Sequence, residues 1–509
     1  MAYDGGSSFP EHEWSAGFVP VLNGLEGVDG AYLDDVAAVK RALEQWNLHA
    51  ALRATWPADP AGALARYQIP LPAETLTPLF DAEQGDRLRQ AVLNGEDLVD
   101  LPLALRRYLA FMRELLRWRD HYRQTCEPAH PLMRAWWHRQ VARIRSQLGP
   151  TKADAIVHAP VAFELNSGCS VGCWFCALSA PALQAVWPYS PAHRQQWQAI
   201  LRVTHEVIGP AAAQGFCYWA TEPFDNPDYE RFLLDFHAVL GRFPMTTTAL
   251  PMRDAKRTHA LIEQHRRLDP GLDRFSVLST GIAARIHAEF SPRQLLLTEL
   301  LPQNKGANPK FRKARAGRAL RAKTGPNQLD QFSKAPTTIA CVSGFLINPC
   351  EHRVQLMTPY PVSPSSPQGF QVLATGQFSS AEQLRDLLES MIASQMPMDL
   401  SWQAEVRLRS DLVVSSPTAN QLRFKSAFTS LNFGGVTGAT QFAALLSQGA
   451  MTAAELAEAR EQALDIPPEQ SFFMIDQLRQ HGLLDETVFA RSSSAYRDSD
   501  GSCNERAGG

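Results

Sequence analysis

Short β-type runs alternate with helical stretches in the middle of this 509-residue chain, and this alternation strongly limits the folds open to it. The runs are "VAFEL" (161), "GFCYWAT" (215), "MTTTAL" (245), "DRFSVLST" (273), "LLLTEL" (295) and "TTIACVSGFLI" (337). The second, third and fourth begin about 30 residues apart, the length of one βα unit. Six such runs predict an α/β fold whose parallel sheet curls into a partial (β/α)6 barrel over 151–400.

Residues 1–150 are predicted to form a helical unit before this region. Apolar residues recur three and four apart in "LALRRYLAFMRELLRWRDHY" (103–122), which predicts one face of a helix. A second helix is predicted over 131–149, where "PLMRAWWHRQVARIRSQLG" opens on proline and closes on glycine. The proline-rich stretch 56–78 is expected to be irregular.

Residues 401–490 are predicted to form a small module of their own. A capping box beginning at Thr452 opens one helix, and a second helix is bounded by Pro468 and Gly482. Two short helices followed by "GLLDE" indicate a winged-helix-like module, which we interpret as a docking site for a peptide. The Ser- and Gly-rich tail, 491–509, is predicted to be disordered.

Composition argues against several partners. The formal net charge is -3, so the chain has no global attraction to nucleic acid or to a membrane surface. A basic run at 304–326 is expected to be a solvated face, with steering of an acidic peptide or nucleic-acid binding as lesser interpretations. No stretch approaches the roughly 18 apolar residues of a membrane span, and "MAYDGGSSFPEHEW" does not resemble a signal peptide. We therefore expect a cytoplasmic protein without a membrane partner.

Three of the eight cysteines, Cys169, Cys173 and Cys176, stand together in "CSVGCWFC", on the loop expected after the first strand. Eight cysteines in a chain of this length do not make a disulfide framework, so a cluster of them indicates metal or redox chemistry. A structural zinc site needs a fourth ligand. The distant candidates for that ligand are His158, His193 and Cys217. A [4Fe–4S] cluster bound by three cysteines instead leaves one iron open to a small molecule.

The motif resembles the radical S-adenosylmethionine (SAM) signature, Cys-x3-Cys-x-aromatic-Cys, with Phe175 at the aromatic position. In that superfamily the open iron binds the methionine part of SAM. An electron from the cluster then cleaves SAM to a 5′-deoxyadenosyl radical, which abstracts a hydrogen atom. The resemblance implies one [4Fe–4S] cluster, SAM as cofactor, and an external electron donor such as flavodoxin or ferredoxin.

The same resemblance implies further contacts to SAM. Where the superfamily often has Gly-Gly-Glu-Pro, this chain has Ala220, Thr221, Glu222 and Pro223. The carboxylate is kept and the glycines are replaced, so backbone carbonyls would have to accept from the SAM ammonium. The polar side chains expected to contact SAM from the fourth run are Ser276 and Ser279.

Longer blocks resemble the polytheonamide-type peptide epimerases, which mature ribosomally synthesised peptides. The blocks are "HAPVAFELNSGCSVGCWFCALSAP", "GFCYWATEPFDNPDYERF", "FPMTTTA", "RFSVLS" and "TIACVSGFLIN". The resemblance covers about 130–380, including "WWHRQ" before the first strand. It implies that L-residues of a precursor peptide are converted to D-residues.

Such an epimerase needs a thiol that returns a hydrogen atom to the opposite face of the α-carbon radical. The cysteines outside the motif are Cys126, Cys217, Cys341, Cys350 and Cys503. Cys341 is the preferred donor because a barrel strand would direct it into the cavity, and Cys350, on the loop beyond, is the alternative. Two other functions remain open: another radical SAM peptide modification, by crosslinking or excision, and a zinc-bound winged-helix binding protein.

Overall fold

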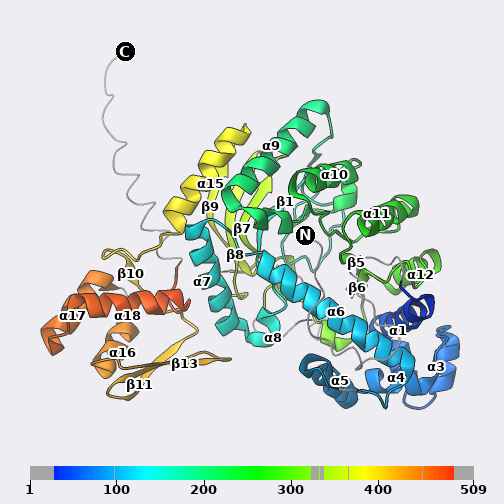
Figure 1. The fold of residues 1–509 in the computed structure, drawn as a ribbon, viewed down its shortest axis with the longest axis horizontal. Helices are drawn as coiled ribbons and strands as arrows, with labels where there is room; N and C mark the ends of the chain where they lie inside the picture. The colour runs from blue at the N-terminus through cyan, green and yellow to red at the C-terminus, as the bar shows by residue number, and fades with distance from the viewer. Residues whose placement is uncertain are drawn as a thin grey trace.

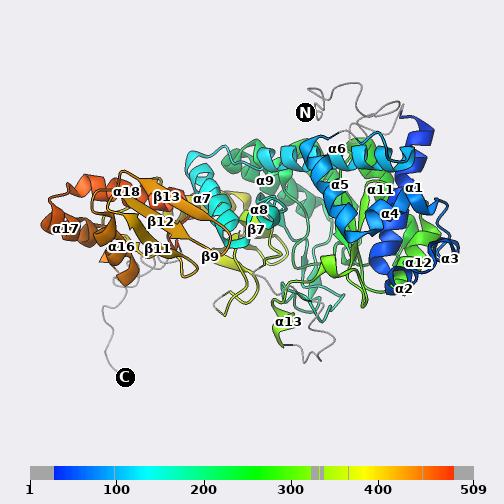
Figure 2. The same cartoon turned by 90° about the horizontal axis from the view of Figure 1, so that it is seen from below.

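The computed structural model describes residues 28–96, 98–321, 332, 337–364, 366–449 and 451–486. Within these residues the protein is mixed α/β, as predicted. It is elongated, with the last three helices at one end and the first helices at the other (Figure 1, Figure 2). The predicted tail 491–509, with Cys503, lies outside the described residues. None of the described helices is both long enough and apolar enough to cross a membrane.

The described part of the first 153 residues contains helices only. They are α1 (Gly30–Leu48), α2 (Ala50–Thr55), α3 (Pro60–Arg66), α4 (Ala73–Phe80), α5 (Ala82–Asn94), α6 (Leu103–Thr125), α7 (Pro131–Leu148) and α8 (Pro150–Ala153). The helices predicted over 103–122 and 131–149 are confirmed. The prediction of an irregular stretch at 56–78 is wrong: Pro60 occupies the first helical position, and the Asp59 carboxylate accepts from the Gly62 N–H at 2.8 Å.

Two sheets form the centre of the molecule. One has the order β1-β7-β8-β9 and the other the order β4-β5-β6. Their strands are β1 (Ala159–Phe163), β4 (Thr247–Thr248), β5 (Asp273–Val277), β6 (Thr298–Pro302), β7 (Val342–Asn348), β8 (Arg353–Pro359) and β9 (Phe370–Gln377). β1 pairs with β7 in parallel, β8 and β9 follow antiparallel, and β4, β5 and β6 are parallel.

The sixth predicted run therefore forms β7 beside β1, not beside β6. The run at 215 makes only an isolated bridge, between Phe216 and Ala162 of β1. No strand ladder joins the two sheets in the described part of the chain, so the partial barrel remains a prediction. The other elements here are β2 (Asn166–Ser167), β3 (Ala185–Val186), α9 (Pro191–Ile208), η2 (Pro210–Gln214), η3 (Pro223–Asp225), α10 (Tyr229–Leu240), α11 (Ala255–Leu268), α12 (Thr280–Glu289), η4 (Pro309–Phe311), α13 (Arg318–Arg321) and α15 (Ala381–Gln395).

The C-terminal module contains an antiparallel sheet in the order β11-β12-β13, followed by three helices. Its elements are β10 (Glu405–Val406), β11 (Val413–Thr418), β12 (Gln421–Lys425), β13 (Ser430–Gly434), α16 (Ala439–Gln448), β14 (Met451–Thr452), α17 (Ala453–Leu464) and α18 (Pro468–Gln480). The capping box at Thr452 is confirmed, and so is Gly482, whose φ of +64° ends α18 in a left-handed turn. The sequence did not predict the three-stranded sheet.

A buried ion pair joins this module to α7. The Arg139 guanidinium, 2% exposed, donates to the Glu486 carboxylate at 2.5 Å. The same carboxylate accepts from the Gln140 amide at 2.6 Å. Burying a charge costs desolvation free energy, which the attraction of the partner charge offsets. Removing one partner therefore leaves the other charge buried without compensation.

We predict that Glu486→Ala lowers the free energy of unfolding of the full chain by about 3 kcal/mol, because the Arg139 charge then stays buried without a partner. Guanidinium denaturation measures the change. Glu458→Ala, on the exposed face of α17, is the matched control and should change the stability by less than about 0.5 kcal/mol. Equal losses in the two variants would contradict the proposed role of the ion pair.

Candidate functional site

The cysteine motif lies on a closed loop that follows β1. β2 and β3 pair at its base, and the Cys169 N–H donates to the Pro181 carbonyl at 3.0 Å. Gly168 has a φ of +83°, and a Cβ atom there would lie 2.3 Å from the Ala182 carbonyl oxygen. Only glycine therefore allows the two ends of the loop to approach so closely.

The three cysteines of this loop are free thiols, each partly exposed. The Cys176 N–H donates to the Cys173 carbonyl at 3.1 Å, which turns the loop back on itself. Burial raises the pKa of Cys173 to about 11, and the neighbouring Cys176 and Cys169 add to this effect because adjacent thiolates repel one another. A cationic metal centre would relieve this repulsion between thiolates.

This donor chemistry fits an iron–sulfur cluster, although the three side chains do not converge on one point. Within the described ranges, no three His, Cys, Asp or Glu side chains form a group that could hold a metal ion. The distant zinc ligands considered from the sequence are engaged elsewhere. His158 Nδ1 contacts Ser343 Oγ at 2.8 Å, His193 Nδ1 contacts the Pro188 carbonyl at 2.7 Å, and Cys217 is buried in the core.

Part of the basic run supports the cysteine loop. The Arg318 guanidinium donates to the Cys173 carbonyl at 2.7 Å and also to the Ala180 carbonyl. The Arg318 N–H donates to the Cys176 carbonyl at 3.0 Å. Lys313 is buried, with its ammonium 5.0 Å from the centre of the Phe175 ring. The prediction of a solvated face is therefore wrong for Lys313 and Arg318, while Lys323 lies outside the described residues.

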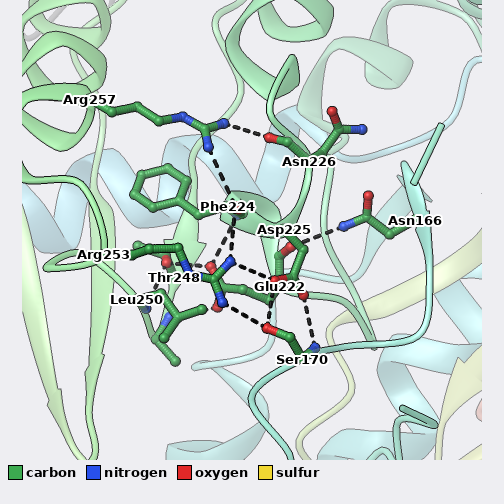
Figure 3. Close-up of polar contacts among 11 residues, drawn as sticks. Asn166, Ser170, Glu222, Phe224, Asp225, Asn226, Thr248, Leu250, Arg253 and Arg257 are labelled. Carbon is green, nitrogen blue, oxygen red and sulfur yellow. Dashed lines mark hydrogen bonds and ion pairs between the residues drawn. The ribbon is translucent and has the colours of Figure 1, made fainter. Parts of the chain in front are cut away.

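Glu222 is buried and its carboxylate is fully engaged (Figure 3). It accepts from Thr248 Oγ1 at 2.5 Å, from the Ala249 N–H at 2.9 Å and from the Phe224 N–H at 3.2 Å. Burial raises the pKa of Glu222, and these hydrogen bonds oppose the rise. The Glu222 carboxylate thus holds the turn after the run at 215 against the end of β4.

Asp225 ties this same turn to the cysteine loop (Figure 3). Its carboxylate accepts from the Ser170 N–H at 2.8 Å and from Ser170 Oγ at 2.5 Å. Arg253 donates to Asp225 at 2.8 Å and to Ser170 Oγ at 2.9 Å. The residue beside Cys169 is therefore held by an ion pair that no sequence pattern predicts.

Glu164, at the end of β1, was not identified from the sequence either. Its carboxylate accepts from the Ala220 N–H at 2.8 Å and from Asn348 Nδ2 at 3.1 Å. Burial raises its pKa to about 7. The sequence does contain a signal for Glu164, since an acidic residue directly after a buried apolar strand needs hydrogen-bond partners. Glu164 fixes the position of Ala220, the first residue of the expected SAM-binding segment.

Two serines were expected to contact SAM. Ser279 Oγ accepts from the Ile282 N–H at 3.1 Å and so caps α12. Ser276 lies on β5 on the same face as Arg274, since side chains two apart on a strand share a face. The structure thus gives Ser279 a structural partner. It places Ser276 on the interior face of the sheet, which is the face that Arg274 shares.

A cavity of about 780 Å³ lies between this interior face and α6. Its lining includes Leu178, Tyr218, Arg274, Glu299, Ile339 and Cys341. Leu178 belongs to the cysteine loop, so the loop and Cys341 border the same space. Burial raises the pKa of the Cys341 thiol, and the nearby Arg274 charge opposes the rise.

Cys350 is absent from the described lining of that cavity. It lies just beyond the carboxyl end of β7, where its sulfur accepts from the Ser167 N–H at the base of the cysteine loop. Cys341 directly precedes the other end of β7. A strand of this length rises about 3.3 Å per residue, so the two thiols lie at opposite ends of the sheet. The structure therefore separates the two candidate hydrogen donors.

Comparisons with known proteins give one relative and no family. No family model and no solved structure matches the chain. The chain is 41% identical over 308 residues to the uncharacterized protein y4wI of Sinorhizobium fredii (strain NBRC 101917 / NGR234). The match covers 59% of this chain and 60% of that protein, so the chain spans about three fifths of the relative's length.

We predict that the stability of the wild-type protein, relative to Glu164→Gln, falls as the pH rises. The pKa of Glu164 is about 7 in the folded protein and near 4.5 when unfolded, so the folded state binds the proton more tightly. The carboxyl group therefore disfavours folding by up to about 3 kcal/mol above pH 7 and by nothing below pH 4.5.

The measurement is the free energy of unfolding of both proteins from about pH 4.5 to pH 8. Glu458→Gln, on the exposed face of α17, is the control for a carboxylate outside the core. Parallel wild-type and Glu164→Gln curves would show that Glu164 titrates normally.

Proposed function

We propose that the chain is a radical SAM peptide epimerase, which converts L-residues of a ribosomally synthesised precursor peptide into D-residues. One observation supports this proposal above the others: a protonated thiol, Cys341, borders a large cavity that the cysteine loop also borders through Leu178. An epimerase needs both groups at one cavity, whereas crosslinking or excision needs no thiol donor. The two sheets would then form the partial barrel of the superfamily.

Cys169, Cys173 and Cys176 would hold the [4Fe–4S] cluster. When bound, the cluster supplies the electron that cleaves SAM to a hydrogen-abstracting radical. Because Thr248 and Ala249 already engage the Glu222 carboxylate, the backbone carbonyls of Ala220 and Thr221 are left as acceptors for the SAM ammonium. An external electron donor, such as flavodoxin or ferredoxin, is part of the proposal.

Cys341 returns the hydrogen atom in this proposal. Hydrogen-atom donation requires the S–H form, and the raised pKa of Cys341 keeps the thiol protonated at neutral pH. The Phe175 ring packs against the Lys313 ammonium and so helps to hold the cysteine loop in position. The C-terminal module would hold the precursor peptide, and its exposed Phe473 on α18 is an apolar contact available to such a partner.

We predict that turnover in D2O leaves one deuterium on each inverted α-carbon of a precursor peptide substrate. The solvent-exchanged Cys341 thiol is the source of that deuterium. Mass spectrometry after hydrolysis to chiral amino acids measures it. Unlabelled D-residues, or a crosslinked or excised product, would exclude the proposed reaction.

The thiol is tested by Cys341→Ala, which should still cleave SAM and should form no D-residues. Cys350→Ala is the matched control and should retain inversion, because Cys350 lies at the other end of β7. Loss of inversion in Cys350→Ala alone would reverse the assignment.

We predict about four irons per chain after anaerobic reconstitution, with the broad visible absorption of a [4Fe–4S] cluster. Cys173→Ala should lose most of this iron, and Cys350→Ala should keep it. Iron and zinc analysis of the purified chain measures both. A colourless protein with about one zinc would favour a zinc-bound binding protein.

A further inference from the structure

Three polar side chains form a row across the second sheet. The register of the strands places Thr247 of β4 beside Arg274 of β5, and Arg274 beside Glu299 of β6. Their neighbour Phe275 on β5 is buried against α12 on the opposite face, and all three residues of the row line the cavity. In-register neighbours on adjacent strands lie about 4.8 Å apart, which lets the side chains act together.

The side chains of this row are linked to one another. Arg274 Nε donates to Glu299 Oε2 at 2.9 Å. The Tyr218 hydroxyl is hydrogen-bonded to both Thr247 and Arg274. Arg274 and Glu299 are nevertheless 37% and 46% exposed. Since both line the cavity, much of this exposure is toward its interior.

Apolar side chains form much of the rest of the cavity wall. α6 contributes apolar side chains such as Leu115 and Leu116, and Phe311 and Ile339 add to them. Of the other charged lining residues, Lys40 pairs with Glu44, Arg119 pairs with Asp120 at 2.9 Å, and the Lys310 ammonium lies 5.3 Å from the centre of the Phe311 ring. An ion pair beside so much apolar surface loses hydration, which a ligand with matching polar groups would restore.

The pair offers both kinds of hydrogen-bonding group. A guanidinium has five N–H donors; Arg274 uses Nε–H on Glu299 and another on the Tyr218 hydroxyl, so further donors are left for a ligand. Glu299 has a second oxygen that no described contact engages. A peptide unit presents one carbonyl acceptor and one N–H donor, which match these two groups. A carboxylate ligand would satisfy Arg274 but would be repelled by Glu299.

We infer that Arg274 and Glu299 bind the backbone of the substrate peptide, Arg274 through a carbonyl and Glu299 through an N–H, at a segment with uncharged, apolar side chains. This inference rests on the proposed function, because it names the part of the precursor that enters the cavity. Arg274 also lies close enough to Cys341 for its charge to favour the thiolate. The bound peptide unit would thus lie beside the thiol, with its neighbouring side chains against α6.

The experiment measures binding of a synthetic probe to the full chain, so that it does not depend on SAM cleavage. One probe is the capped peptide acetyl-Ala-Ala-Val-Ala-Ala-amide, and a second carries a methyl group on the valine nitrogen. We expect the wild-type chain to bind the second probe about fivefold more weakly, because Glu299 then has no N–H to accept. A third probe, with aspartate in place of valine, should also bind more weakly because Glu299 repels it.

The variants assign these effects to residues. Arg274→Gln should bind the valine probe about tenfold more weakly, while Arg285→Gln, an exposed arginine on α12, should bind it like the wild type. Glu299→Gln should remove the difference between the valine and N-methyl probes, which a purely structural role would not do. Tyr218→Phe, which keeps the ring, serves as the second variant if Arg274→Gln does not fold, and should weaken binding about threefold.

Two results would overturn the inference: a wild-type chain that binds none of the probes, or an Arg274→Gln chain that folds and binds the valine probe as the wild type does. A Glu299→Gln chain that still discriminates between the valine and N-methyl probes would refute the N–H contact. If the probes behave as expected while the precursor gains no deuterium, the backbone contact stands and the proposed epimerase fails. If deuterium is incorporated while Arg274→Gln binds the valine probe normally, the proposed epimerase stands and the backbone contact fails.

Discussion

A buried carboxylate at the end of β1 is the contact on which the rest of the candidate site depends. Glu164 joins the end of β1 to the turn at Ala220 and to Asn348 at the end of β7. Three segments distant in sequence thus meet at one side chain. Because a buried carboxyl group without hydrogen-bond partners is costly, these contacts hold the three segments together.

Further hydrogen bonds connect the contacts of Glu164 to the cysteine loop. Asn348 also donates to the Asn166 carbonyl at 3.1 Å, and the Asn166 amide donates to the Glu222 carbonyl at 3.0 Å. Neither Ala220 nor Thr221 has a positive φ, so neither position requires glycine. Carboxylates and amides hold this segment in position.

Local patterns in the sequence predicted much of what is local in the structure. α6 and α7 follow from apolar periodicity and end residues, and the capping box and Gly482 bound α17 and α18 as expected. The cysteine loop after a buried strand was also correctly placed. Each of these depends on residues within a few positions of one another.

Pairings between distant segments could not be predicted in this way. The position of β7 beside β1 depends on hydrogen bonds between residues about 180 apart, which no periodicity encodes. Arg318 looked like part of a solvated basic run because its partners, the carbonyls of the cysteine loop, are backbone groups with no signature in the sequence. The same is true of Glu164, whose partners are a backbone N–H and a side-chain amide.

The separation of Cys341 from Cys350 bears directly on stereochemistry. Inversion requires that hydrogen leaves one face of the α-carbon and returns to the other, so the donor must lie across the substrate from the abstracting radical. Cys350 contacts Ser167 at the base of the cysteine loop, on the side where the radical would form. A thiol there would return hydrogen to the face that lost it and regenerate the L-residue. Cys341, at the other end of β7, borders the cavity that Leu178 also borders, so the proposed inversion favours Cys341 over Cys350 as the donor.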